Sequence, residues 1–291
     1  MTSIDQITHE QKVSLAKETT FRVGGEALDF YIPSSEEELC LLSRYFKEAG
    51  QDFLVLGNGS NVLFADTPFK TPIIKIGDAY SSITVDGNRI HVEAGAMLSK
   101  VAAVARDHAL SGLCFAAGIP GTIGGAICMN AGAYGGEMKD VVESVTIVTE
   151  GGKTEVRSCD EMDFGYRRSA MQPGQIVSRV TLRLAEGDVA EINKKMEELK
   201  KARVEKQPLE YPSAGSTFKR PEGYFAGKLI DDSGLRGYRV GGAMVSEKHC
   251  GFVINYDHAT AQDILTLIED VRRIVHEKQG IWLTPEVKIF A

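Results

Sequence analysis

This chain of 291 residues lacks a long hydrophobic run, an excess of positive charge and any close pairing of cysteines. No apolar stretch approaches the roughly 20 residues that a membrane-spanning helix needs. The first 13 residues, MTSIDQITHEQKV, contain neither the basic start nor the apolar centre of a signal peptide. We therefore expect a cytoplasmic protein that has no membrane partner.

Positive charge is scarce, because 33 lysines and arginines stand against 40 aspartates and glutamates and leave a formal net charge of −7. Nonspecific nucleic-acid binding needs a basic face, so this balance argues against a nucleic-acid partner. The five cysteines form no CxxC pair and no cysteine–histidine spacing suited to zinc. We expect no metal site, and we expect these cysteines to be reduced and mostly buried: Cys40, Cys114, Cys128, Cys159 and Cys250.

Glycine, by contrast, is concentrated in residues 118–136, GIPGTIGGAICMNAGAYGG, which contain seven glycines and no charged side chain. So much glycine costs backbone entropy on folding, so this backbone has to adopt positive φ or lie closely against a flat or anionic group. The functional interpretation is a cradle for the phosphates and ring of a cofactor. The alternative is a flexible surface loop, but Ile119, Ile123 and Ile127 make the segment too apolar for that.

A second glycine-rich turn, GNGSN at residues 57–61, follows a predicted buried strand. In a Rossmann fold such a turn opens a helix, whereas here it leads directly into the strand-like residues 62–64. A phosphate would therefore be held by turn amides and by the side chains of Asn58, Ser60 and Asn61 rather than by a helix dipole. Taken alone, this turn is weak evidence for a cofactor.

The order of predicted elements is that of an α+β protein, and 43% hydrophobic residues suffice for two packed domains. A strongly charged helix at residues 191–207 is interpreted as the link between them, although such a basic face is more often simply solvated. Periodicity predicts the other main helices after Ser34 or Ser35 and at residues 98–108, 224–233 and 260–279, and strands at residues 27–32, 53–56, 62–64, 81–85, 89–94, 141–148, 153–157, 175–184, 241–245, 252–255 and 283–290.

Nine short motifs occur in a fixed order along the chain, and together they carry a specific resemblance. They are FRVGG, LGNGSN, GIPGTIGGA, NAGAYG, YRRS, AGSTFKRP, LID, GGA and PEVKIF. In this order they resemble the UDP-N-acetylenolpyruvoylglucosamine reductase (MurB) family, from about Phe21 to Phe290.

The resemblance implies an α+β fold with a two-subdomain FAD-binding domain of the vanillyl-alcohol oxidase type and a smaller α+β substrate-binding domain. We place the FAD-binding domain at residues 1–190, with subdomains at about 15–76 and 77–190, and the substrate-binding domain at 191–291. It also implies an oxidoreductase of peptidoglycan synthesis, cell-wall biogenesis, cell shape and cell division. That enzyme uses NADPH and noncovalent FAD to reduce the enolpyruvyl ether of UDP-N-acetylglucosamine enolpyruvate to UDP-N-acetylmuramate. We expect a monomer.

Reduction of the enolpyruvyl group places negative charge on the substrate carboxylate and requires a proton at the adjacent carbon. The positions that match the family motifs for these tasks are Arg167, Ser216 and Glu286. Without the resemblance, Arg167 would be read as a surface ion-pair partner, Ser216 as a turn hydroxyl and Glu286 as an exposed residue at the start of a strand.

The same matching assigns cofactor-binding and substrate-binding residues. Lys206 is the first choice for the substrate diphosphate, followed by Arg203 and Arg220, and the alternative for all three is a solvated basic face. The other substrate-binding assignments are Tyr166 and Lys228. The cofactor-binding assignments are Gly57, Asn58, Gly59, Ser60, Asn61, Gly118, Ile119, Pro120, Gly121, Thr122, Gly124, Gly125 and Ala131.

The strand that ends at Leu184 is followed by only a few residues before the next helix. This resembles the shorter form of the family, which lacks a lid loop with a substrate-binding tyrosine. Two other classes remain open: an oxidase of the same fold, and a UDP-sugar-binding protein without catalysis. The oxidases often attach their flavin through a histidine in the first glycine turn, where this chain has Asn61, so noncovalent FAD is favoured.

Overall fold

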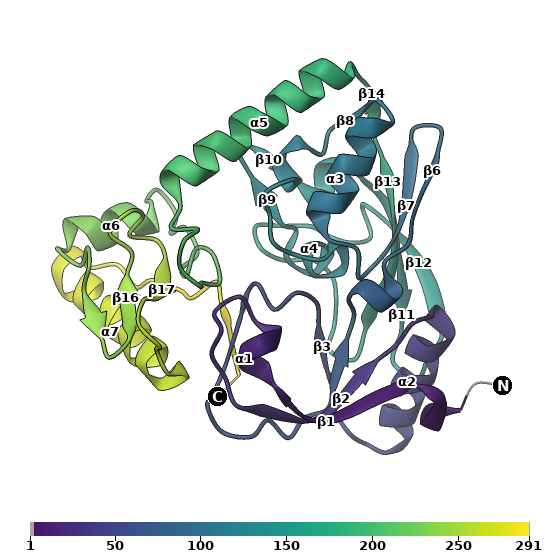
Figure 1. Ribbon diagram of the computed structural model, residues 1–291, viewed down its shortest axis with the longest axis horizontal. Helices are drawn as coiled ribbons and strands as arrows, with labels where there is room; N and C mark the ends of the chain where they lie inside the picture. The colour runs from purple at the N-terminus through teal and green to yellow at the C-terminus, as the bar shows by residue number, and fades with distance from the viewer. Residues whose placement is uncertain (1–2, 291) are drawn as a thin grey trace. The chain divides into compact units, whose positions relative to one another are not determined.

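The computed structural model describes residues 3–290, and residues 1–2 and 291, the outer ends of the two expected domains, lie outside it. The described chain divides into two compact units (Figure 1). The larger unit comprises the chain up to Gln11, residues 29–58 and residues 71–203. The smaller unit comprises residues 12–28, residues 59–70 and the chain from Val204 onward. Two short segments of the N-terminal part therefore belong to the smaller unit.

One sheet has the strand order β1-β2-β5-β3, and its β2–β5 and β5–β3 ladders are parallel. The parallel strands agree with the predicted strand–helix–strand unit, although β5 inserts between its two strands. The only α-helix between β2 and β3 is α2 (Glu36–Glu48). The strands are β1 (Thr8–Ser14), β2 (Glu26–Ile32), β5 (Ile73–Lys75) and β3 (Leu54–Leu56).

Helix α2 begins and packs as its sequence predicts. The hydroxyl of Ser35 accepts a hydrogen bond from the Glu38 amide at 3.2 Å, which satisfies one of the first free N–H groups. The apolar residues spaced along one face are buried in the core of the larger unit: Leu39, Leu42 and Phe46.

The second sheet of the larger unit is antiparallel, with the order β12-β11-β13-β7-β6. Gly87 (φ 57°) lies in the turn of the β6–β7 hairpin, between two strands that the sequence predicts. Helix α4 contacts β13 and β7. The elements are β6 (Ile83–Asp86), β7 (Arg89–Glu93), β11 (Val142–Val148), β12 (Thr154–Ser158), β13 (Ile176–Arg183), α3 (Leu98–Asp107), α4 (Ile123–Met129) and the short pairs β8 (Leu110–Ser111) with β14 (Ala185–Glu186) and β9 (Gly132–Ala133) with β10 (Gly136–Glu137).

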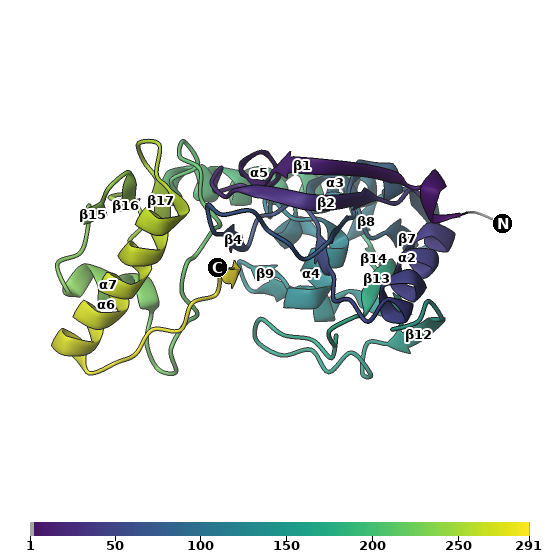
Figure 2. The ribbon, with the colours of Figure 1, turned by 90° about the horizontal axis from the view of Figure 1, so that it is seen from below.

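In the smaller unit, helix α7 packs along the three-stranded sheet β15-β16-β17, as Figure 2 shows. A separate parallel pair joins β4 to β18, which are 226 positions apart in register (Val62 with Lys288). The elements are α1 (Leu15–Glu18), β4 (Val62–Phe64), α6 (Ala226–Asp232), β15 (Arg239–Val240), β16 (Ala243–Val245), β17 (Val253–Asn255), α7 (Ala261–Gln279) and β18 (Lys288–Phe290); α5 (Val189–Lys206) ends just after the boundary at Arg203.

The sequence misses several elements and overextends one, and the missed ones include α1, β15 and the short pairs β8–β14 and β9–β10. Strands β1 and β5 and helix α4 have no counterpart among the predicted segments, and α4 lies inside the segment interpreted as a cradle. The sequence predicts a strand over residues 283–290, whereas β18 covers Lys288–Phe290, because these three residues have β4 as partner. Within residues 3–290, no helix has the length and apolar character required to cross a membrane.

Candidate functional site

The two glycine-rich segments meet in the larger unit. The side-chain amide of Asn58 donates a hydrogen bond to the Pro120 carbonyl at 2.8 Å. A Cβ atom added at Gly57 would lie 2.4 Å from Oγ1 of Thr122, so only glycine permits this approach. The structure therefore brings together the first part of the GNGSN turn and the start of the 118–136 segment, which the sequence assigns to one cofactor.

Helix α4 is held tightly at its N-terminal end. Thr122 is its buried N-cap, and its hydroxyl accepts a long hydrogen bond of 3.5 Å from the Gly125 amide. The next two amides already have protein partners, because Ile123 donates to the Ala96 carbonyl at 2.8 Å and Gly124 donates to the Ala94 carbonyl at 2.9 Å. These two amides are thus used by the protein and cannot be counted as phosphate donors.

Glycine at position 124 has a structural cause. An added Cβ would lie 2.9 Å from Cβ of Ala94, so α4 approaches the end of β7 too closely for a side chain. At Gly125, in contrast, the nearest atom to an added Cβ is Oγ1 of Thr122 at 3.6 Å, an ordinary contact. Gly124 therefore supports the cradle by packing, whereas the face of Gly125 has room for an approaching group.

These observations fit an FAD molecule held in the larger unit. The two glycine segments are fixed to one another by a side-chain hydrogen bond, and a loop of this kind can follow a flat cofactor closely. The first turn of α4 contains no acidic side chain that would repel a phosphate.

The Arg167 loop is fastened to the C-terminal end of α4 through Asn130. Asn130 is fully buried in a left-handed conformation (φ 41°), and its amide donates to Oε2 of Glu137 at 2.7 Å and to the Gly165 carbonyl at 3.1 Å. Arg167 itself has positive φ (56°), and its guanidinium donates to the Gly132 carbonyl at 3.3 Å. The structure thus links the YRRS motif to the NAGAYG motif.

The other assigned residues of the larger unit lie near these loops. Tyr166 is 52% exposed, and its ring lies 5.0 Å from the Arg167 guanidinium carbon. Burial lowers the pKa of Arg203, with a smaller opposite effect from Tyr134. An added Cβ at Gly118 would meet the Arg203 guanidinium at 3.0 Å, so Arg203 covers the first glycine of the cradle segment.

In the smaller unit, the remainder of the GNGSN turn contacts the C-terminal strand. The side-chain amide of Asn61 donates to the Glu286 carbonyl at 3.1 Å, and the Lys288 amide donates to the Asn61 carbonyl at 3.0 Å. Gly59 (φ 62°) leaves no room for a side chain, because an added Cβ would lie 2.1 Å from the Glu18 carbonyl oxygen. Asn61 therefore anchors the Glu286 segment, a contact that the sequence does not reveal.

Ser216 and Glu286 are brought onto neighbouring segments of the same unit. The Glu286 amide donates to the Thr217 carbonyl at 2.8 Å, and Phe218 forms an isolated bridge with Pro285. Ser216 is exposed and Glu286 is half-buried. The AGSTF and PEV motifs, about 70 residues apart, are thus directly paired.

The cations assigned to substrate binding differ in their surroundings. Lys206 is exposed at the end of α5, and the guanidinium of Arg220 lies over the Phe225 ring at 4.5 Å. Lys228 forms an ion pair with Asp232, four residues along α6, at 2.9 Å, and this partner raises its pKa. Lys228 and Asp232 are four residues apart on one helix, and this spacing predicts such an ion pair, although the family motifs do not indicate it.

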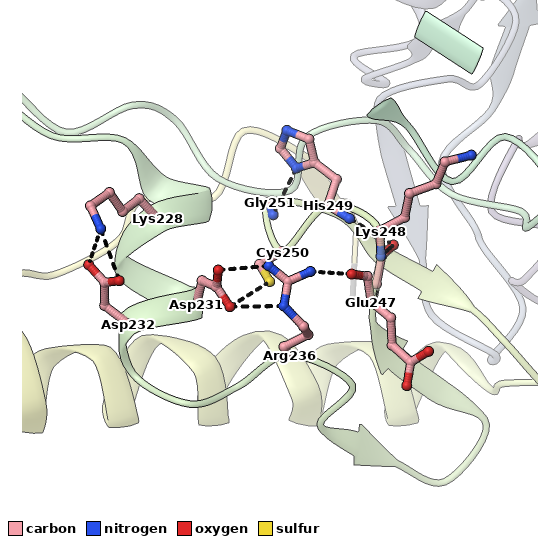
Figure 3. Close-up of polar contacts among 10 residues, drawn as sticks. Lys228, Asp231, Asp232, Arg236, Glu247, Lys248, His249, Cys250 and Gly251 are labelled. Atoms are coloured by element: carbon pink, nitrogen blue, oxygen red, sulfur yellow. Dashed lines mark hydrogen bonds and ion pairs between the residues drawn. The ribbon is translucent and has the colours of Figure 1, made fainter. Parts of the chain in front are cut away.

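A polar cluster around the LID motif has no role in the sequence interpretation (Figure 3). Asp231 binds both nitrogens of the Arg236 fork, at 3.0 Å and 2.7 Å, and this pairing lowers its pKa. Arg236 also donates to the Glu247 carbonyl. Burial raises the pKa of Cys250 to about 11, so its thiol is protonated and donates to Asp231 at 3.6 Å.

Comparisons with known proteins cover nearly the whole chain. Residues 207–290 match the family model "UDP-N-acetylenolpyruvoylglucosamine reductase, C-terminal domain", and residues 29–157 match "FAD binding domain". A relative from Caldanaerobacter subterraneus subsp. tengcongensis, named UDP-N-acetylenolpyruvoylglucosamine reductase, is 50% identical over 276 residues, or 94% of this chain and 91% of that protein. A relative of the same name from Lachnoclostridium phytofermentans is 49% identical over 280 residues, or 94% of this chain and 90% of that protein.

A solved structure shows the same similarity in three dimensions. The crystal structure of UDP-N-acetylenolpyruvylglucosamine reductase (MurB) from Thermus caldophilus is 37% identical and has a TM-score of 0.83. The match covers 98% of this chain and 99% of that chain. The predicted α+β FAD-binding fold with two domains is therefore confirmed.

Proposed function

The chain belongs to the UDP-N-acetylenolpyruvoylglucosamine reductase family, and from this membership we propose that Arg167, Ser216 and Glu286 are its catalytic residues. It is an FAD-containing, NADPH-dependent oxidoreductase of peptidoglycan synthesis. It reduces the enolpyruvyl ether of UDP-N-acetylglucosamine enolpyruvate to UDP-N-acetylmuramate. FAD, when bound, would supply the hydride chemistry that connects NADPH to the enolpyruvyl group.

In the proposal, Ser216 gives a proton to the carbon next to the substrate carboxylate. Arg167 and Glu286 are assigned to the negative charge that develops on that carboxylate, with Arg167 as the cation. The observation that carries the assignment is the 2.8 Å hydrogen bond from the Glu286 amide to the Thr217 carbonyl, because it pairs the two motifs that contain Ser216 and Glu286.

For the cofactor, we propose that the phosphates of FAD follow the 57–61 turn and residues 118–125, with Ala131 near the ring. For the substrate, we propose that Lys206 binds the diphosphate and that Tyr166, Arg220 and Lys228 assist. The exposed position of Lys206 supports its choice, whereas the ion pair of Lys228 with Asp232 makes that lysine the weakest candidate of the group.

We also propose the domain division at residue 190, with FAD-binding subdomains at about 15–76 and 77–190 and substrate binding in 191–291. The two matched family models, at 29–157 and 207–290, support it. The enzyme is proposed to act as a cytoplasmic monomer that takes part in cell shape and division through wall synthesis, without a nucleic-acid partner. The nucleotide substrate supports the cytoplasmic location. The net charge of −7 supports the monomeric state and the absence of a nucleic-acid partner.

An anaerobic spectroscopic experiment tests the function. The purified protein should be yellow, should lose its absorbance when NADPH is added, and should regain it when UDP-N-acetylglucosamine enolpyruvate follows. A colourless protein that still binds the nucleotide would indicate a UDP-sugar-binding protein. Colour that returns with O₂ and not with the enolpyruvyl nucleotide would indicate an oxidase.

A further inference from the structure

Thr217 joins three segments of the smaller unit and is completely buried. Its amide donates to the Gly251 carbonyl at 2.8 Å, and its carbonyl accepts from the Glu286 amide at 2.8 Å. Its hydroxyl oxygen accepts from the Val253 amide at 2.9 Å. The residue immediately before it is Ser216, so all three bonds restrain the backbone next to the proposed proton donor.

Of the three hydrogen bonds, only the one to the hydroxyl depends on the Thr217 side chain. A side chain of equal size without an oxygen could not accept this bond. Val253 is 1% exposed, so its N–H group has no access to water if the Thr217 oxygen is removed. A buried N–H group without an acceptor is strongly unfavourable, and the backbone shifts to relieve it. Threonine thus couples the Ser216 segment to β17, and the Glu286 amide couples it to the last segment of the chain.

The turn that carries the Gly251 carbonyl is itself rigid. The buried hydroxyl of Ser246 accepts from the amide of His249 at 3.3 Å, and the Phe252 amide donates to the His249 carbonyl at 2.9 Å. Burial lowers the pKa of His249, so its ring is neutral and Nδ1 accepts from the Gly251 amide at 3.1 Å.

The polar cluster drawn in Figure 3 also holds this turn in place, through Glu247 and Cys250. Arg236 bridges the Asp231 carboxylate and the Glu247 carbonyl, and the buried Cys250 thiol donates to the same carboxylate. A fork of two charge-assisted bonds fixes the guanidinium in one orientation. The position of the Gly251 carbonyl, and with it that of Thr217, is therefore set by contacts that reach back to the LID motif.

We infer that Thr217 is a positioning residue for the reduction step: its three hydrogen bonds place Ser216 and Glu286 relative to each other. The inference rests on the proposed function, which assigns those two residues to the reaction. A displacement of about 1 Å in a reacting group can reduce a rate by roughly 10². In this role Thr217 touches none of the reacting atoms and acts through Ser216 and Glu286.

The test compares Thr217→Val with Thr217→Ser. Valine has nearly the same volume and removes the hydroxyl, whereas serine keeps the oxygen and removes a methyl group. We expect the Val variant to retain stoichiometric FAD and to be reduced by NADPH within about two-fold of wild type. Its reoxidation by the enolpyruvyl nucleotide should be slower by roughly 10², and the Ser variant should recover to within about three-fold of wild type.

A second measurement does not depend on turnover. Amide hydrogen exchange of residues 250–254 and 284–290 should be faster in the Val variant than in the Ser variant. If the Val variant does not accumulate as folded protein, Thr217→Cys replaces the oxygen with a weak sulfur acceptor and should give intermediate exchange and intermediate reoxidation.

The outcomes separate this inference from the proposed function when Ser216→Ala is measured alongside. If Ser216→Ala slows reoxidation and Thr217→Val does not, the inference fails and the assignment of Ser216 stands. If Thr217→Val slows reoxidation and Ser216→Ala does not, Thr217 positions Glu286 and the assignment of Ser216 fails. Equal slowing of both half-reactions by Thr217→Val, without rescue by serine, shows general loss of structure and overturns the inference.

Discussion

Among single residues, Ser216 carries the most demanding assignment, because an aliphatic hydroxyl is a far weaker acid than a carboxyl group. It can donate its proton only to a strongly basic carbon, and it has to be placed accurately for that transfer. The structure exposes its side chain while the neighbouring Thr217 is buried and bonded on three sides. The backbone next to Ser216, the proposed proton donor, is therefore held in place.

Replacement of Ser216 tests this assignment directly. Ser216→Ala should leave FAD reduction by NADPH within a few-fold of wild type, because that half needs no proton from the protein. Reoxidation by the enolpyruvyl nucleotide should fall by roughly 10² to 10⁴, the range for a positioned general acid. Ser216→Cys should retain far more activity, since a thiol can donate. Stopped-flow traces that slow equally in both halves would assign Ser216 to pocket shape instead.

Two lysines offer a matched comparison for substrate binding. Lys206 is exposed at a helix end, whereas Lys228 already pairs with Asp232 at 2.9 Å. Lys206→Ala should raise KM for the nucleotide about ten-fold with little change in FAD reduction, because the lost contact is ground-state binding. Lys228→Ala should have a smaller effect on KM. Steady-state kinetics check both, and the reverse order would move the diphosphate site to α6.

Among the elements, α7 shows how local sequence sets a boundary. The Thr260 hydroxyl accepts from the Asp263 amide at 3.0 Å, while the Asp263 carboxylate accepts from the Thr260 amide at 3.0 Å and the Gly242 amide at 3.2 Å. Gly280 (φ 72°) ends the helix in a left-handed conformation. This helix covers the three-stranded sheet of the smaller unit, so its start also holds the turn before β16.

The capping box predicts a pH dependence of stability. The Thr260 and Gly242 amides lower the pKa of Asp263 below its ordinary value of 3.8, the Thr260 amide having the largest effect. The carboxylate bonds therefore stabilise the fold above about pH 4, and this contribution is lost as the pH falls through the lower pKa of the folded state. Asp263→Asn should be less stable than wild type at pH 7, and the difference should shrink toward pH 3.

Thr260→Ala is the control, because it removes the uncharged half of the box. Its loss, about 1 kcal/mol, should depend much less on pH. Urea unfolding at several pH values measures both variants. A difference between Asp263→Asn and wild type that stays constant down to pH 3 would contradict the assigned cause.

For the molecule as a whole, the smaller unit is assembled from three separate parts of the chain. Strand β18 pairs with β4, the core includes Phe21, Val23 and Leu63, and the Asp66 carboxylate accepts from the Ala261 amide at 3.0 Å. The C-terminal sequence alone lacks all of these partners. A division of the chain by position in the sequence therefore differs from its division by contacts.

A fragment of residues 204–290 should accordingly show no cooperative thermal transition, because it lacks β4 and several core side chains. Coexpression with a fragment that ends at residue 203 supplies residues 12–28 and 59–70 and should restore a cooperative transition. Circular dichroism during heating measures both samples. A sharp transition of residues 204–290 alone would show that the N-terminal segments are dispensable.

Local sequence determined the long helices, the hairpin turn and the family, because each depends on residues close together in the chain. Capping residues, apolar spacing and Gly87 act over a few positions, and each of the nine motifs is only a few residues long. Family membership in turn determined the cofactor and the reaction.

Only the tertiary structure decided which distant residues meet. Asn61 contacts Glu286 across 225 positions, Gly124 is required by Ala94, and three-residue β5 exists only because two strands flank it. The hydroxyl of Thr217 gains its role from Val253 in the same way. Such contacts arise from long-range packing and strand pairing, whose free energy depends on the folded neighbours and leaves no local pattern in the sequence.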